Sequence, residues 1–109
     1  MTAATETDTV ATRVARGVAL LDEKKPGWDG HIHLPTLDIM YGTYCVLGQV
    51  FGNYDTGARI LGLDIRSDVV DCGFNGPFND EGRWQDMCEL KHEWVRVITS
   101  RRQNHEVTL

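Results

Sequence analysis

The strongest constraint on the fold is a helical repeat of apolar residues near the C-terminal end of the chain. Between Trp84 and Ile98, apolar side chains recur every three or four residues and cover roughly half of a helical wheel. Charged and amide side chains fill the other half. Basic residues near the C-terminal end interact favourably with the helix dipole. The pattern predicts a long amphipathic helix, capped by Asn79 or Asp80, that packs against the rest of the chain.

A second apolar stripe, over residues 10–21, predicts a helix near the N-terminus. We expect Thr7 or Asp8 to cap its start, and the Pro-Gly pair after the stripe to end it. Gly17 lies within the stripe, where a glycine weakens a helix by about 1 kcal/mol relative to alanine. Its presence there indicates close packing against a large side chain, for which Trp28 is the candidate.

The middle of the chain has a less regular pattern. Residues 43–52 are the most apolar segment and predict a buried central helix that ends at a glycine. A short helix should follow, capped by Asp55 or Thr56. Alternation over 30–34 predicts an extended connector, and the turn residues of 64–79 predict a loop with at most a short strand.

Length and composition predict a single small domain that is mainly α, with three to four helices and at most a short β element. The chain has 109 residues, 41% hydrophobic and 25% charged, which is the balance of a globular protein. Aromatic residues are spread from Trp28 to Trp94, so the core should draw on most of the chain. We place the globular domain at residues 9–101, with flexible ends at 1–8 and 102–109.

The sequence contains neither an apolar run long enough to span a bilayer nor a secretion signal. We therefore expect no membrane contact and a cytoplasmic location. The three cysteines, Cys45, Cys72 and Cys88, cannot all pair, which is typical of reduced thiols in a reducing compartment.

Cys88 and His92 form one candidate site for a metal-dependent enzyme. They are four residues apart on the predicted last helix, a spacing that places paired metal ligands on one face. His31 and His33, or Cys72, would complete a set of four ligands. No Cys-x-x-Cys or His-Glu-x-x-His motif accompanies them, and a buried cysteine beside a boundary histidine is the ordinary alternative. On balance we expect no cofactor.

Cys45 is the candidate for a thiol-dependent enzyme. A helix that begins at Gly42 or Thr43 would place this residue in its first turn, where the helix dipole lowers the pKa of a thiol. The apolar residues on either side of Cys45 favour burial instead, and burial makes a thiol unreactive.

The charge distribution disfavours nucleic acid as a partner. The chain carries a net charge of −5, and residues 54–95 alone carry −5. Binding to a duplex normally requires a basic stripe that displaces counterions. Only Arg96, Arg101 and Arg102 fit that description, and they are the basis of a further alternative, a nucleic-acid-linked regulator.

The acidic middle of the chain points instead to a protein partner, although a solvated helix face also explains such charges. The candidate contact residues combine carboxylates with two aromatic side chains expected at the surface: Trp28, Tyr54, Asp64, Asp68, Asp86, Glu89 and Glu93. An apolar strip on the last helix, if exposed, would pair equally well with a second copy of the chain. A homo-oligomer therefore stays open.

Several segments carry a resemblance to a known family. Residues 19–28 read Ala-Leu-Leu-Asp-Glu-Lys-Lys-Pro-Gly-Trp, and residues 45–52 read Cys-Val-Leu-Gly-Gln-Val-Phe-Gly. Other landmarks are Leu37-Asp38, Leu61-Gly62-Leu63, Cys72-Gly73-Phe74 and Trp94. Together they resemble a family of small proteins from actinobacteria and their phages that has no assigned function.

The resemblance implies a phage or prophage origin and a cytoplasmic accessory role. Members of that family often carry an additional cysteine shortly before the one that matches Cys45, and this chain has none there. That difference weakens the metal hypothesis further. We therefore predict a non-enzymatic accessory protein that binds a host protein.

Overall fold

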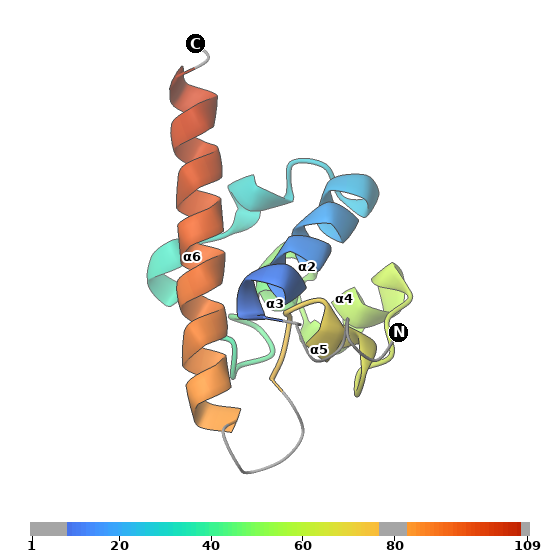
Figure 1. Cartoon of the computed structure of the whole chain (residues 1–109). Helices are drawn as coiled ribbons and strands as arrows, with labels where there is room; N and C mark the ends of the chain where they lie inside the picture. The colour runs from blue at the N-terminus through green and yellow to red at the C-terminus, as the bar shows by residue number, and fades with distance from the viewer. Residues whose placement is uncertain (1–8, 77–82, 108–109) are drawn as a thin grey trace.

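The structure is a computed structural model that describes residues 9–76 and 83–107. Within these residues, all the regular secondary structure is helical (Figure 1). The α-helices are α2 (Val10–Lys24), α3 (Val46–Phe51), α4 (Tyr54–Leu61), α5 (Asp68–Asp71) and α6 (Arg83–Val107). Two 3-10 helices, η1 (Trp28–His31) and η2 (Leu34–Thr36), connect α2 to α3. The prediction of a small, mainly α domain is confirmed. None of the described helices is both long and apolar enough to cross a membrane.

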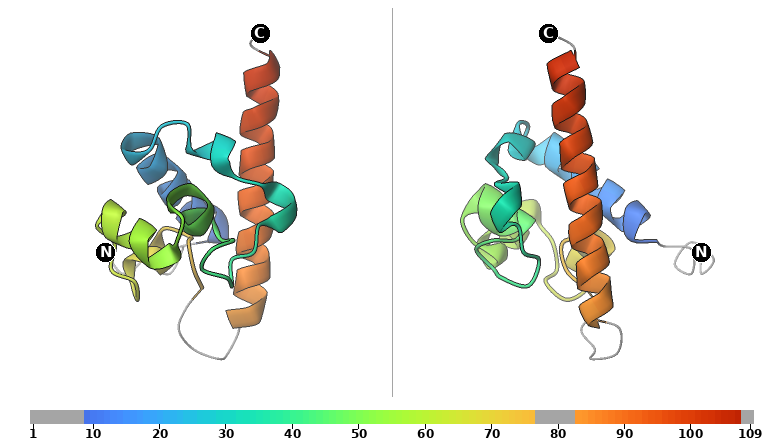
Figure 2. Two further views of the ribbon diagram at one scale, coloured as in Figure 1. Left: turned by 180° about the vertical axis from the view of Figure 1, so that it is seen from behind. Right: turned by 90° about the vertical axis from the view of Figure 1, so that its left-hand side faces the viewer.

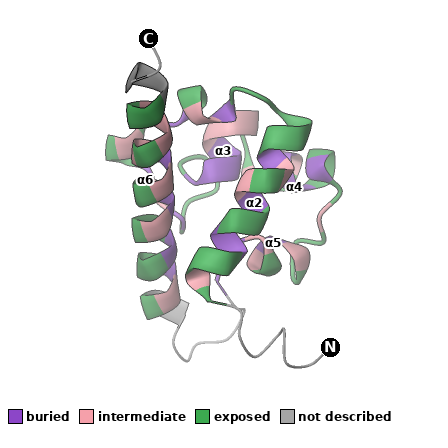
Figure 3. Ribbon diagram, turned by 45° about the horizontal axis from the view of Figure 1, so that its top comes forward, coloured by how far each residue is buried: buried purple, intermediate pink, exposed green. Residues whose placement is uncertain are grey.

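The helices pack in pairs, with the long helix α6 paired to α2. Helix α2 packs directly against it, and α3 packs against α4. Seen from behind, the connector between α2 and α3 passes across α6, whose C-terminal end projects beyond the other helices (Figure 2). Buried positions of α2 and α6 face the interior, while their outer faces are exposed (Figure 3).

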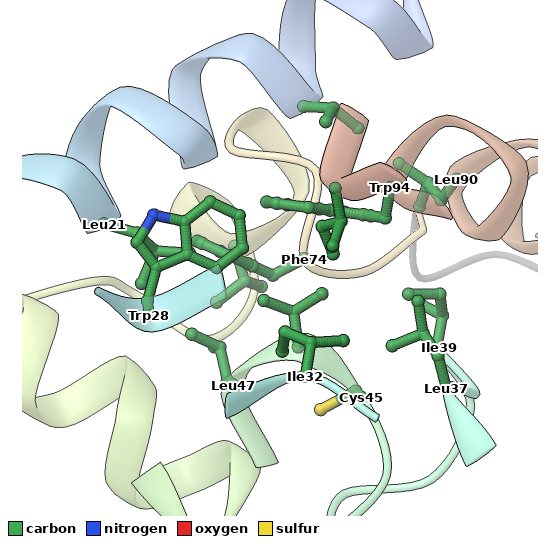
Figure 4. Packing of buried hydrophobic residues seen from close by; sticks show 14 of the residues in the cluster. Leu21, Trp28, Ile32, Leu37, Ile39, Cys45, Leu47, Phe74, Leu90 and Trp94 are labelled. Atoms are coloured by element: carbon green, nitrogen blue, oxygen red, sulfur yellow. The ribbon is translucent and has the colours of Figure 1, made fainter. Parts of the chain in front are cut away.

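Three aromatic rings from distant parts of the chain form the centre of the core (Figure 4). The edge of Trp28 packs on Trp94, with ring centroids 5.8 Å apart, and Phe74 stacks on the same indole at 5.4 Å. The buried apolar cluster runs from Val14 to Ile98. The prediction that the core draws on most of the chain is confirmed.

Helix α2 begins and ends close to its predicted bounds. The Thr9 hydroxyl accepts a hydrogen bond from the backbone N–H of Thr12 at 3.1 Å, so Thr9 is the N-cap. The helix ends at Lys24, ahead of the Pro-Gly pair, as predicted. Thr9, rather than the predicted Thr7 or Asp8, is therefore the cap. Helix α4 is likewise capped by Asn53, whose side chain accepts from the backbone N–H groups of the predicted caps Asp55 and Thr56. The caps predicted for the last helix, Asn79 and Asp80, lie outside the described residues.

Gly17 allows the closest approach between α2 and its neighbours. A Cβ atom added to Gly17 would lie 2.3 Å from the carbonyl oxygen of Cys72 and 3.1 Å from the Trp94 ring. The predicted close packing is therefore present, but its partner is Trp94 rather than Trp28. Sequence spacing alone cannot distinguish two tryptophans that both reach the core.

Two segments between the main helices differ from their predicted form. The connector over 30–34 is extended only at Ile32 and His33, because Gly30 and His31 belong to η1 and Leu34 to η2. Ile32 is buried between two exposed histidines, which gives the sequence the alternation of a strand. Asp68–Asp71 form α5 where the sequence predicted a loop with at most a short strand. Val69 is buried on the inner side of that helical turn.

Helix α6 continues past the predicted domain end at residue 101. The Arg102 guanidinium donates hydrogen bonds to the backbone carbonyls of Asp29 and Ile32, so the helix remains tied to the domain beyond that point. The predicted end of the domain is therefore too early, because apolar periodicity does not reveal a helix held by polar contacts. The predicted flexible segment 1–8 lies outside the described residues.

Candidate interaction surface

Residues 38–44, which we call the aromatic turn, carry most of the exposed large apolar side chains of the described chain. Met40, Tyr41 and Tyr44 are 52%, 60% and 50% exposed. The rings of Tyr41 and Tyr44 contact each other edge to face, with centroids 6.3 Å apart. The two tyrosines therefore form one exposed aromatic pair, with Met40 adjacent in the chain.

The backbone of the aromatic turn is held by its own hydrogen bonds. The backbone N–H of Asp38 donates to the carbonyl of Tyr44 at 3.2 Å, and the N–H of Tyr44 donates to the carbonyl of Tyr41 at 3.1 Å. The Asp38 carboxylate accepts from the backbone N–H of Met40 at 3.0 Å, which forms an Asx turn. The loop is therefore ordered even though the side chains of Met40, Tyr41 and Tyr44 are exposed.

Residues of helices α3 and α4 also hold the aromatic turn through hydrogen bonds. The Gln49 side chain donates to the carbonyl of Tyr44 at 2.9 Å, and the backbone N–H of Tyr54 donates to the carbonyl of Gly42 at 2.8 Å. A Cβ atom added to Gly48 would lie 2.3 Å from that same Gly42 oxygen, so only glycine allows α3 to approach so closely. The glycine of the Cys-Val-Leu-Gly-Gln segment thus supports the turn.

Two shallow hollows adjoin Met40. Ile39 and Met87 are almost fully buried and line both hollows together with Met40. Between the turn and α6 the first hollow is completed by Asp38, Cys88 and Lys91. The second is completed by Gly42, Cys45, Tyr54 and Asn75. A partner side chain entering beside Met40 would meet two thioethers, which are polarisable and adapt to different shapes.

Cys45 does not occupy the position that a thiol nucleophile requires. Helix α3 begins at Val46 rather than near residue 43, and Cys45 is its N-cap, with Sγ accepting from the backbone N–H of Gly48 at 3.3 Å. Burial raises the pKa of the Cys45 thiol, against the smaller lowering effect of the backbone N–H of Gly48. The predicted first-turn position and lowered pKa are both wrong.

The predicted metal ligands are not brought together. Cys88 and His92 are both exposed on α6, but Cys88 lines the hollow beside Met40, whereas His92 lines a different one with Val10 and Glu89. His31 and His33 are exposed in the connector. In the described part of the chain, no group of three or more histidine, cysteine, aspartate or glutamate residues is placed to hold a metal ion.

The two aromatic residues predicted to contact a partner are not exposed anchors. Trp28 is fully buried, and its Nε1–H donates to the Asp22 carboxylate at 2.9 Å. The Pro-Gly turn folds this indole back into the core, which corrects the expectation that it lies at the surface. Tyr54 is partly buried, and its hydroxyl donates to the carbonyl of Ile65 at 3.3 Å.

Most of the predicted acidic contact residues bind their own chain. Asp86 forms an ion pair with Arg13 at 3.0 Å, and Glu93 pairs with Arg96. Asp68 accepts from the backbone N–H of Asp64 at 2.9 Å.

The two remaining acidic candidates have simpler environments. The Asp64 carboxylate accepts from the backbone N–H groups of Arg66 and Ser67, and these bonds lower the pKa of Asp64. Glu89 is exposed on α6. Of the acidic candidates, Glu89 thus most resembles a solvated surface charge.

The three arginines of the nucleic-acid alternative also have partners within the chain. Arg96 binds Glu93, as described above. Arg101 binds the carboxylates of Asp22 at 2.7 Å and Asp29 at 2.9 Å, and its guanidinium lies 5.2 Å from the centre of the Trp28 ring. Arg102 binds backbone carbonyls of the connector. Contacts within the chain therefore account for the basic residues near the C-terminal end of α6.

Sequence reasoning missed the aromatic turn because its residues continue the most apolar run of the chain. The end of the turn falls in the segment 43–52, which was predicted to be a buried helix. The available signals were Asp38 two residues before Met40, an Asx-turn spacing, and Gly42 between two tyrosines. Both indicate a turn rather than a helix at these residues.

No protein-family model, curated protein or solved structure matches the chain. The surface is therefore interpreted from its own chemistry.

Proposed function

We propose that the chain is a small non-enzymatic binding module whose partner protein docks on the aromatic turn and the adjoining face of α6. The observation that carries this proposal is the row of three large apolar side chains, each at least half exposed, on a turn that is fixed by hydrogen bonds. Contiguous exposed apolar patches on a small domain commonly mark interaction sites.

The ordered backbone makes this surface energetically suited to binding. A flexible loop loses conformational entropy when it is fixed on a partner, whereas a loop that is already ordered avoids much of that cost. Tyrosine is enriched among interface residues whose truncation costs about 2 kcal/mol or more of binding free energy. Tyr41 and Tyr44 therefore supply two anchors in a pre-organised arrangement.

We also propose that the partner is a host protein and that the chain acts as a phage or prophage accessory protein in the host cytoplasm. The support is the sequence resemblance to small actinobacterial and phage proteins. Recognition by the aromatic turn itself does not depend on that origin.

The experiment compares two sets of exposed apolar residues in one protein. One tagged variant combines Met40→Ser, Tyr41→Ser and Tyr44→Ser. A matched control combines Ile60→Ser and Ile65→Ser. Ile60 and Ile65 are 59% and 47% exposed and lie outside the aromatic turn. Each protein is incubated with host lysate in mild salt, and its unfolding temperature is measured to verify that it is folded.

Proteins retained by the wild type should also be retained by the Ile60/Ile65 control and should be lost from the aromatic-turn variant. Retention of the same proteins by a folded aromatic-turn variant would show that the partner docks elsewhere. If the wild type retains nothing above the level of the untagged control, the binding-module proposal loses its support.

A further inference from the structure

A hollow separate from the aromatic turn lies between α2, α5 and the segment after α4; we call it the acidic groove. Its aliphatic and thiol side chains come from Ala19, Leu20, Leu63 and Cys72. Its charged side chains come from Arg16, Glu23, Asp68 and Asp71. No residue of the groove belongs to residues 38–44 or to the face of α6 beside them.

The charges around this groove are predominantly negative. Three carboxylates face one guanidinium, and Arg16 donates a hydrogen bond at 3.2 Å to the backbone carbonyl of Asp71 rather than to its carboxylate. Within the described chain, the carboxylates of Glu23 and Asp71 form no ion pair. Two negative charges at the edge of the groove are therefore available to an external cation.

Cys72 lines the groove, and its thiol is affected by the same negative charges. Cys72 is half-buried, and burial raises the pKa of its thiol. The carboxylates of Asp68 and Asp71 raise this pKa further. The thiol therefore stays neutral at physiological pH and contributes an apolar surface beside Leu20 and Leu63. The groove combines an aliphatic lining with an anionic edge.

We infer that the acidic groove binds a short segment of another protein that presents one aliphatic side chain next to a lysine or arginine. The aliphatic side chain would pack on Leu20 and Leu63, while the cation would pair with Glu23 or Asp71. The module would then have two docking surfaces.

The test is a titration of the ¹⁵N-labelled full chain with three blocked peptides, followed by NMR. One contains Lys-Leu-Lys between glycines, one Glu-Leu-Glu, and one Lys-Gly-Lys. We expect saturable shifts of the amide signals of Leu20, Leu63 and Cys72 with Lys-Leu-Lys alone. Added salt should weaken this binding, because the ion pairs are exposed.

Variants connect the signals to the carboxylates. Combined Glu23→Gln and Asp71→Asn replacement removes two charges with little change of shape, and should weaken Lys-Leu-Lys binding about tenfold, since each exposed pair contributes up to about 1 kcal/mol. Asp55→Asn, at an exposed carboxylate in the first turn of α4, is the matched control and should leave the affinity unchanged.

Three results would overturn the inference: no shift of the groove amides, equal binding of Glu-Leu-Glu, or equal shifts with Lys-Gly-Lys. Peptide-induced shifts confined to Tyr41 and Tyr44 would also contradict it, while leaving the proposal for the aromatic turn intact. The amide signals of Leu20, Leu63 and Cys72 monitor the acidic groove, and those of Tyr41 and Tyr44 monitor the aromatic turn. Each proposal can therefore fail independently of the other.

Discussion

The thiol of Cys45 illustrates how the position of one atom decides its chemistry. A shift of the helix start from residue 43 to Val46 changes Cys45 from a first-turn residue to the N-cap. Its Sγ then points at the N–H of Gly48 from a buried position, where ionisation is unfavourable. Burial, which outweighs the lowering effect of the N–H groups at the helix start, therefore makes this thiol unreactive.

This burial has a consequence for stability at high pH. The pKa of the Cys45 thiol is raised in the folded chain from its ordinary value of 9.0. Above pH 9 the unfolded chain loses this proton first and so binds fewer protons, which lowers the free energy of unfolding as pH rises. Urea denaturation at a series of alkaline pH values should show this decline. Cys45→Ser should reduce the slope of this decline, and Cys88→Ser, at an exposed thiol, is the matched control for replacing a cysteine.

Gly48 is the residue on which the geometry of the aromatic turn depends most. In Gly48→Ala, the new methyl group would lie 2.3 Å from the carbonyl oxygen of Gly42 and 2.8 Å from Cα of Thr43. Because these are backbone atoms, the turn must move, and we expect a loss of about 2 kcal/mol or more in unfolding free energy.

Gly30→Ala is the matched control for that measurement. A Cβ atom at Gly30 has no heavy atom within 4 Å, so this variant should change stability by less than about 0.5 kcal/mol in the same urea titration. Equal stability of the two alanine variants would contradict the proposed role of Gly48.

At the scale of elements, Arg13 joins α2 to two other parts of the chain. Its guanidinium binds the Asp86 carboxylate of α6 at 3.0 Å, and also donates to the carbonyls of Val70 at 2.8 Å and Asn75 at 3.0 Å. Arg13 and Asp86 have side chains only 10% and 19% exposed. One buried guanidinium therefore fixes the position of α2 relative to α5 and α6.

Removing this guanidinium should be costly. Arg13→Ala leaves the Asp86 carboxylate and two carbonyls without their donor, so we expect a loss of about 3 kcal/mol in unfolding free energy. Denaturant titration followed by tryptophan fluorescence measures this loss. Arg96→Ala, which breaks an ion pair with a 66% exposed arginine, is the control and should have little effect. Similar losses in both variants would argue against a buried tie.

The helices with apolar periodicity were the elements that sequence predicts well. The stripes of α2 and α6 and the glycine after α4 follow directly from their spacing, and Gly62 indeed has the left-handed conformation that ends a helix. Helix α5 was missed because one turn is too short to show a period. The start of α3 was missed because a cysteine is an uncommon N-cap.

For the molecule as a whole, sequence predicted exposed aromatic side chains, as in the proposed binding surface, but not where they lie. Trp28 was predicted at the surface and is fully buried, whereas Tyr44 was placed in the predicted buried helix over 43–52 and is exposed. Burial of a particular aromatic residue depends on how distant segments meet, and composition cannot show that. The acidic candidates were likewise mostly engaged by their own chain.

Site-specific photo-crosslinking tests the binding module most directly. Tyr41 is replaced by the photoreactive p-benzoylphenylalanine in the full chain, which is produced in host cells and irradiated there. The same replacement of Ile60, which is 59% exposed compared with 60% for Tyr41, is the matched control. A discrete adduct with one protein should form from position 41 and be absent from position 60. No adduct at position 41, or the same adducts from both positions, would contradict the aromatic turn as the docking surface.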